Sequence, residues 1–203
     1  MIAMIRKCLF SLLLFCTAIL AAQNNIDTLR LNSAYRELVQ NPKSVELQKE
    51  FLAAFPNTWK VFLSTYDFCP QKDLTMYNLG YDHIVNGLGK LVTLLPDSVY
   101  CDKLIGISIG GRWEADAPNY LQLVVRKTMQ KKSEVMFQRL SLLRQEDVFS
   151  FWCFFFHSLH STKEDIRLYS ELHDKMQRKY PMIVKDMKAA FVVSSGKASA
   201  SLP

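Results

Sequence analysis

The segment from Val148 to Phe156 constrains the fold more than any other part of the chain. Seven of its nine residues are Val, Trp or Phe, in the sequence VFSFWCFFF. A helix that is apolar on every side is stable only when other helices surround it. Nine residues are also too few to cross a bilayer, which takes about 20. We therefore predict that this segment is the central core helix and that Trp152 is buried.

Hydrophobic residues recur at helical intervals through almost the whole chain, without sustained period-two alternation. The spacing predicts an all-α fold of about eight to ten helices, with Ser44 and Thr58 as N-caps. The predicted helices cover residues 31–40, 45–55, 59–66, 74–95, 98–109, 117–130, 134–143, 146–156, 163–179 and 182–192. We expect a single domain over 31–193, built as a compact bundle or a short irregular helical array. Residues 23–30 are the expected linker, and the small polar residues 194–203 the expected disordered tail.

The first 22 residues have the layout of a secretory signal. Arg6 and Lys7 precede an apolar run from Cys8 to Ala22 that ends in two alanines, and the polar Gln23-Asn24-Asn25 follows. The run is short for a spanning helix, so an uncleaved anchor is the less favoured alternative. We predict that residues 1–22 are removed and that the mature protein is periplasmic or secreted, with no membrane span.

The charge of the mature chain argues against a nucleic-acid partner. Removing the signal lowers the net charge from +6 to +4, because 23 basic residues then face 19 acidic ones. A nucleic-acid surface would cluster Lys and Arg with interleaved aromatic residues. The pairs Lys131-Lys132 and Arg178-Lys179 are isolated in the sequence and are typical of solvated helix faces.

Cysteine usage is compatible with export but does not indicate a disulfide scaffold. The mature chain keeps Cys69, Cys101 and Cys153. An odd count in an oxidising compartment leaves at least one free thiol or an intermolecular bridge. Cys69 and Cys101 lie in or near predicted connectors, so a disulfide between them is left open. Cys153 is expected to be a buried, inert thiol.

Two histidines follow the aromatic run and require a test for metal binding. His157, His160 and Glu164 would share one face of a continuous helix, and that spacing can hold zinc. The segment Ser161-Thr162-Lys163-Glu164 is a capping box that starts a new helix, however, which places both histidines in a connector. The pattern also differs from the HExxH motif. We expect no metal and no other cofactor.

The second unusual segment is IGGRWEADAPNYLQ, from Ile109 to Gln122. Gly110 and Gly111 allow a sharp turn, and Asp116 is a predicted N-cap for a helix with Pro118 in its first turn. Arg112, Glu114 and Asp116 could form a polar site for acid–base chemistry, which would require pKa values that the environment separates. Helix capping and a surface ion pair explain the same residues. No nucleophile motif, phosphate loop or dinucleotide fingerprint is present.

Three segments together resemble a family of small exported or surface-associated helical proteins from Bacteroidetes-type bacteria. The similar segments are FLAAFPNTWKVFLSTYDF (51–68), KLIGISIGGRWEADAPNYLQ (103–122) and SFWCFFFHSLHS (150–161). The family's G-x-W-x-A-D-A-x-N-Y and S-F-W-x-F-x-F patterns match here, including Trp113, Asp116 and His160. His157-Ser158 stands where the family has Asp-Gly. Some members lie near secreted-toxin systems, so the resemblance implies an immunity-type binding role.

Two functions of different classes follow from these observations. The favoured one is an exported, non-catalytic protein that binds another protein, such as a toxin that it neutralises. The alternative is a periplasmic hydrolase that uses Glu114, Asp116, His157 and His160. The candidate functional residues under either hypothesis are Arg112, Trp113, Glu114, Asp116, His157 and His160.

Overall fold

The chain folds into a single all-α domain, as the hydrophobic spacing predicts. A computed structural model describes residues 26–71, 73–113, 116–157 and 163–195, and within them it contains ten helices and no strand. In chain order the helices are α2 (Thr28–Gln40), α3 (Val45–Ala54), α4 (Trp59–Tyr66), α5 (Thr75–Asn78), η1 (Asp82–Leu91), α6 (Asp97–Ser108), α7 (Asp116–Leu140), α8 (Gln145–Phe156), α9 (Lys163–Met176) and α10 (Pro181–Ser195).

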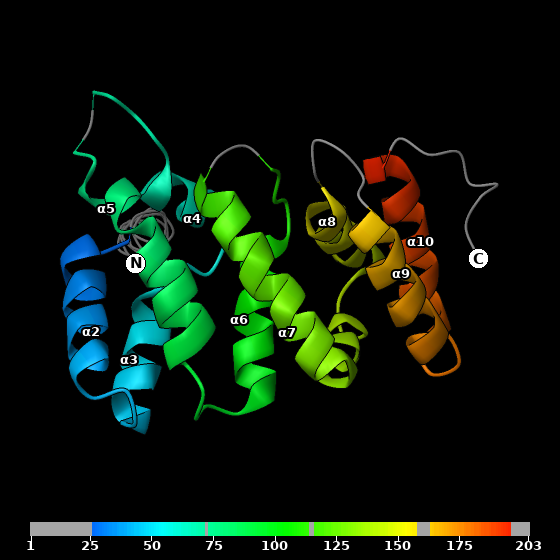
Figure 1. Ribbon diagram of the computed structural model, residues 1–203, viewed down its shortest axis with the longest axis horizontal. Helices are drawn as coiled ribbons and strands as arrows, with labels where there is room; N and C mark the ends of the chain where they lie inside the picture. Colours follow the sequence, from blue (N-terminus) through cyan, green and yellow to red (C-terminus); the bar gives the residue numbers. More distant parts are fainter. Residues whose placement is uncertain (1–25, 72, 114–115, 158–162, 196–203) are drawn as a thin grey trace, which may run out of the picture.

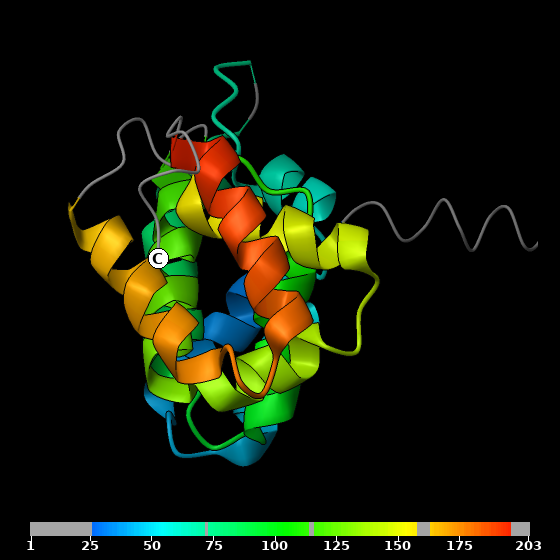
Figure 2. The ribbon, with the colours of Figure 1, turned by 90° about the vertical axis from the view of Figure 1, so that its right-hand side faces the viewer.

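The helices succeed one another along the longest axis of the molecule, from α2 and α3 at one end to α9 and α10 at the other (Figure 1). Viewed from the second end, α10 and α9 lie across the near face of the stack (Figure 2). The tightest neighbours are α2 with α3, α6 with α7, and α8 with α10. One hydrophobic cluster nevertheless runs from Leu31 of α2 to Phe191 of α10. The architecture is therefore an irregular helical array with a continuous core.

Helix starts follow the capping residues in the sequence. The Ser44 hydroxyl accepts a hydrogen bond from the Leu47 N–H at 3.3 Å, and Thr58 caps Val61 in the same way at 3.4 Å. Both predicted N-caps are confirmed. The first helix begins earlier than its apolar spacing predicts, because Asp27 caps α2 and brings residues 28–30 into the helix.

The aromatic run forms α8, and it is the core helix that the sequence predicts. Phe151, Trp152, Phe154 and Phe155 are fully buried, and the Trp152 and Phe156 rings stack at 5.9 Å. One side of α8 is less buried: Cys153 is only half-buried, contrary to the expectation that it lies within the core. Neither α8 nor any other described helix is long and apolar enough to cross a membrane.

The structure divides one predicted helix and joins two others end to end. The single helix expected over 74–95 is wrong: the chain forms α5, a turn, and then the π-helix η1. The two helices expected over 117–130 and 134–143 follow one another in α7, and the chain departs from helical geometry between them, at Lys132 (φ −129°, ψ 34°). The predicted break between these two helices is therefore confirmed, as a kink rather than a loop.

The three cysteines of the described chain are all free thiols, so Cys69 and Cys101 do not form the disulfide that the sequence left open. Cys101 is the fully buried thiol, and burial raises its pKa to about 11. Cys69 instead lies in the connection after α4, where its Sγ donates a hydrogen bond to the Gln71 side chain at 3.3 Å.

Candidate functional site

The glycine turn at 109–113 lies directly against α8. Gly110 has φ +81°, a conformation that favours glycine. A Cβ on Gly111 would lie 2.6 Å from Phe154 Cδ2, so only glycine lets the turn approach α8 so closely. The Gly110-Gly111 pair is therefore required by packing as well as by the turn.

Two hydrogen bonds hold this turn on α8. The Gly110 N–H donates to Ser150 Oγ at 2.8 Å, and the Trp113 N–H donates to His157 Nδ1 at 2.7 Å. Because Nδ1 accepts a hydrogen bond, the His157 ring carries its proton on Nε2 when neutral. His157 thus fixes the backbone of the turn. Beside it lies an open groove of about 630 Å³ whose lining includes Arg112 and Cys153.

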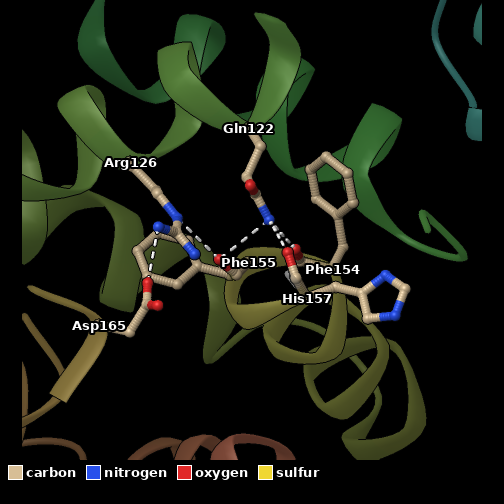
Figure 3. Close-up of polar contacts among 6 residues, drawn as sticks. All are labelled: Gln122, Arg126, Phe154, Phe155, His157 and Asp165. Atoms are coloured by element: carbon tan, nitrogen blue, oxygen red, sulfur yellow. Dashed lines mark hydrogen bonds and ion pairs between the residues drawn. The ribbon is translucent and has the colours of Figure 1, made fainter. Parts of the chain in front are cut away.

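The end of α8 that carries His157 is attached to α7 by side chains. Gln122 Nε2 donates to the Phe154 and His157 carbonyls, each at 2.7 Å (Figure 3). Arg126 Nε donates to the Phe155 carbonyl at 2.9 Å. The last carbonyls of a helix lack intrahelical partners, so these two side chains satisfy groups that would otherwise be buried without hydrogen bonds.

Arg126 also joins α7 to α9. Its Nη1 lies 2.8 Å from Asp165 Oδ1, and the Asp165 side chain is only 4% exposed (Figure 3). A buried carboxylate requires such a partner, because an unpaired buried charge costs several kcal/mol. Arg126 therefore connects the C-terminal end of α8 with both α7 and α9.

A set of partly exposed aromatic side chains surrounds the start of α7; we call Phe68, Tyr77, Tyr81 and Tyr120 the aromatic patch. Phe68 and Tyr81 are 50% and 47% exposed. The Phe68 and Tyr77 rings lie 5.1 Å apart, and those of Tyr81 and Tyr120 lie 5.3 Å apart. Edge-to-face pairs at these distances are favourable, so each ring supports another.

Asp116 belongs to this patch. Its Oδ2 accepts a hydrogen bond from the Tyr77 hydroxyl at 2.8 Å, and this bond raises the pKa of Tyr77. The sequence predicted Asp116 as the N-cap, the residue before the helix, whereas in the structure it is the first residue of α7. Its carboxylate thus links the start of α7 to α5.

These segments lie along one edge of the helical array; this edge, which we call the loop end, comprises residues 67–71, 73–74 and 109–113, Asp116, His157 and the aromatic patch. In Figure 1 the α4–α5 connection, the α6–α7 connection and the C-terminal end of α8 all lie along the same edge. Residues far apart in the sequence therefore lie along one edge of the molecule, where Arg112 is exposed and Trp113 is partly exposed.

The structure brings together some of the predicted site residues but not as a catalytic pair. Arg112, Trp113, Asp116 and His157 all belong to the loop end, whereas Glu114 and His160 lie outside the described residues. Ser161 and Thr162 of the predicted capping box also lie outside them, and its other two residues, Lys163 and Glu164, begin α9. Asp116 bonds to Tyr77 and His157 to the Trp113 backbone, and no hydrogen bond or ion pair joins these two described side chains.

The groove beside His157 contains a thiol without the features of a nucleophile. Burial raises the pKa of Cys153, whereas catalytic thiols have a lowered pKa next to a cation or a helix N-terminus. No group of three His, Cys, Asp or Glu side chains within the described ranges is arranged to hold a metal ion.

The sequence did not single out Phe68, Tyr77 and Tyr81 as site residues. They lie in or beside the connection between α4 and η1, which the sequence assigned largely to a long helix. Aromatic residues within a short, polar connector are the signal that could have indicated them, since such residues have little core to pack into.

Comparisons with known proteins give no relative from which to assign a function: no family model, no curated protein and no solved structure matches the chain.

Proposed function

We propose that this protein is an exported, non-catalytic binding protein that recognises another protein through the loop end. The aromatic patch carries the proposal, because aromatic residues and Arg are enriched in protein–protein interfaces and dominate their energetic hot spots. Phe68 and Tyr81 each leave about half of their surface exposed, and the exposed Arg112 lies on the adjoining turn. Asp67, Asp73 and Asp116 are also exposed there, so the charged groups of the loop end are mainly acidic, and the surface fits a partner with a basic rim around an apolar centre.

The rigidity of the loop end supports the same function. Surfaces that are ordered before binding lose less conformational entropy on association. The hydrogen bonds from Gly110 to Ser150 and from Trp113 to His157 hold the glycine turn in place in the free protein, and the bond from Tyr77 to Asp116 holds α5 against the start of α7. A toxin that the protein neutralises in the periplasm is the partner class that we propose.

A capture experiment tests the proposal. The tagged mature chain should retain a specific protein from a periplasmic extract, and the double variant Tyr81→Ala plus Trp113→Ala should lose it, because hot-spot residues typically cost at least ~2 kcal/mol each. The control is Val39→Ala plus Leu142→Ala, which removes exposed apolar side chains (50% and 65% exposed) elsewhere on the molecule. Equal loss in both variants, with both folded, would contradict the proposed surface.

A second variant separates binding from hydrolysis. Glu114→Gln plus His160→Gln removes proton transfer but keeps side-chain size and hydrogen-bonding capacity. A hydrolase that depends on these groups would lose roughly a hundredfold or more in rate. We expect cells that carry this variant to retain protection against the partner toxin, and partner affinity to stay within a few-fold of wild type. Complete loss in a folded protein would favour the hydrolase.

A further inference from the structure

A second region of the molecule combines a cavity with an unbalanced concentration of positive charge. Between η1, the start of α6 and α7 lies a cavity of about 180 Å³. Four lysines line it, Lys90, Lys127, Lys131 and Lys132, together with a single carboxylate, Asp97. We call this cavity the lysine cleft.

The internal partners in the lysine cleft account for only part of this charge. Lys132 forms an ion pair with Asp97, and Lys90 Nζ donates to the neutral Asn86 side chain at 2.8 Å. Neither Lys127 nor Lys131 has a hydrogen bond or ion pair within the part of the chain that the structure describes. Four ammonium groups against one carboxylate leave the lining with an excess of three positive charges.

Three lysines of the cleft, Lys90, Lys127 and Lys131, are exposed, so their mutual repulsion is weak and their ammonium groups are accessible to a ligand. Lys127 and Lys131 are four residues apart on one helix, where like charges repel. The kink at Lys132 (φ −129°, ψ 34°) lies at the point where this lysine pairs with Asp97 at the start of α6. The backbone thus departs from the helix where a third lysine joins the same cleft.

The rest of the lining is suited to a small, partly enclosed ligand. Val124 and Tyr100 lie in the wall, and the Tyr100 hydroxyl donates to the Leu88 carbonyl at 2.9 Å. Gly89 lets η1 approach α7, since a Cβ there would lie 2.9 Å from Val124 Cγ2. Ammonium groups next to low-dielectric walls attract anions more strongly than the same groups on a flat surface.

We propose that the lysine cleft binds a phosphate-bearing anion. Lysine is a point-charge partner for phosphate, and a group with at least two negative charges would offset the excess on the lining. The site is distinct from the loop end, and it adds a ligand to the proposed partner protein. The phosphate belongs either to a soluble molecule or to an anionic lipid headgroup.

Inorganic pyrophosphate is the probe for the test, titrated by calorimetry into the full mature chain at low ionic strength. Saturable binding is expected, and its affinity should fall as salt is added. Lys127→Gln plus Lys131→Gln should weaken binding at least tenfold. The control, Lys43→Gln plus Lys60→Gln, makes the same change in net charge on exposed residues outside the cleft and should stay within twofold. Unchanged thermal unfolding shows that both variants fold.

A vesicle arm distinguishes the two sources of phosphate. Binding to vesicles of phosphatidylglycerol in phosphatidylcholine, lost in the Lys127/Lys131 variant and competed by pyrophosphate, assigns the cleft to a lipid headgroup. Pyrophosphate binding without vesicle binding assigns it to a soluble phosphate. Absence of saturable pyrophosphate binding to the wild type, or equal weakening in the two variants, overturns the proposal.

Discussion

His83 is the buried titratable residue that no pattern in the sequence singled out. It is fully buried in η1, its Nδ1 lies 3.1 Å from the Tyr66 hydroxyl, and the Tyr35 ring lies 4.8 Å away. Burial lowers its pKa to about 4, although the negative charge of Asp82 acts in the opposite direction. The sequence shows only that His83 lies in a predicted helix with both polar and apolar residues. Its burial, which favours the neutral imidazole, becomes visible only in the folded structure.

This pKa predicts an acid-sensitive fold. The unfolded chain binds a proton on His83 below about pH 6.5, whereas the folded chain does so only near pH 4. The contribution of neutral His83 to the free energy of unfolding is therefore fully present above pH 6.5 and is lost as the pH falls toward 4. Between pH 7 and 4.5 we expect the wild type to lose about 2 kcal/mol more unfolding free energy than His83→Gln, which keeps a partner for Tyr66. Urea unfolding at both pH values measures this, and equal losses would show that His83 does not titrate on unfolding.

Trp152 tests the core at a single residue. It is fully buried, and the Phe151 and Phe137 rings lie 5.1 and 5.5 Å from its own. Trp152→Ala should lower the free energy of unfolding by about 3–5 kcal/mol through lost contacts and a cavity. Trp152→Phe should cost clearly less, because the indole N–H has no hydrogen-bond partner among the described residues. If the alanine variant unfolds like wild type in urea, α8 is not the central helix.

At the scale of elements, most helices could be predicted because their signals are local. Apolar residues three and four apart define one face, and Ser44 and Thr58 each cap a helix whose first turn follows directly in the sequence. These local signals were sufficient to predict the all-α fold class. The kink in α7 was also visible, since the predicted spacing broke between 130 and 134.

The segment 74–95 could not be predicted in the same way. Its apolar spacing is helical, but the chain there forms α5 and the π-helix η1. At Gly87 a Cβ would lie 2.7 Å from Phe51 Cζ, so the close contact with α3 decides the local path. Long-range packing of this kind has no local sequence signature beyond the glycines themselves.

Gly87 and Gly80 form a matched pair for this interpretation. Gly87→Ala should lower the free energy of unfolding by about 1–3 kcal/mol, because the added methyl group overpacks the contact with Phe51. At Gly80 the nearest side-chain atom to an added Cβ, Tyr66 Cδ1, is 3.7 Å away, which is ordinary contact. Gly80→Ala should therefore be neutral or stabilise by up to about 1 kcal/mol. Thermal unfolding of both variants checks the order, and a more stable Gly87→Ala would contradict the packing argument.

At the scale of the whole molecule, the sequence indicated the candidate site only in part. Arg112, Trp113, Asp116 and His157 were predicted, and the structure places them at the loop end. Their partners were not, because Trp113 and His157 are 44 residues apart and Gly110 and Ser150 are 40 apart. Which connections meet depends on how the helices stack, and single-sequence spacing does not determine that.

The lysine cleft could not be predicted from the sequence either. In the sequence, Lys131-Lys132 is an isolated basic pair. The fold adds Lys90 from η1 and Lys127 from the preceding turn of α7, so four lysines line one cavity. The concentration of positive charge therefore arises only when η1 packs against α7, and the sequence shows only the basic pair.

Amide hydrogen exchange of the captured complex is the measurement that tests the central claim most directly. Free and partner-bound protein would be compared peptide by peptide after short exposure to deuterated buffer. Our account predicts that binding slows exchange at residues 67–71, 73–74, 109–113 and around His157, where the loop end lies, and leaves the exposed connection after α7 unchanged. Slower exchange confined to α9 and α10, with the loop end unaffected, would contradict it.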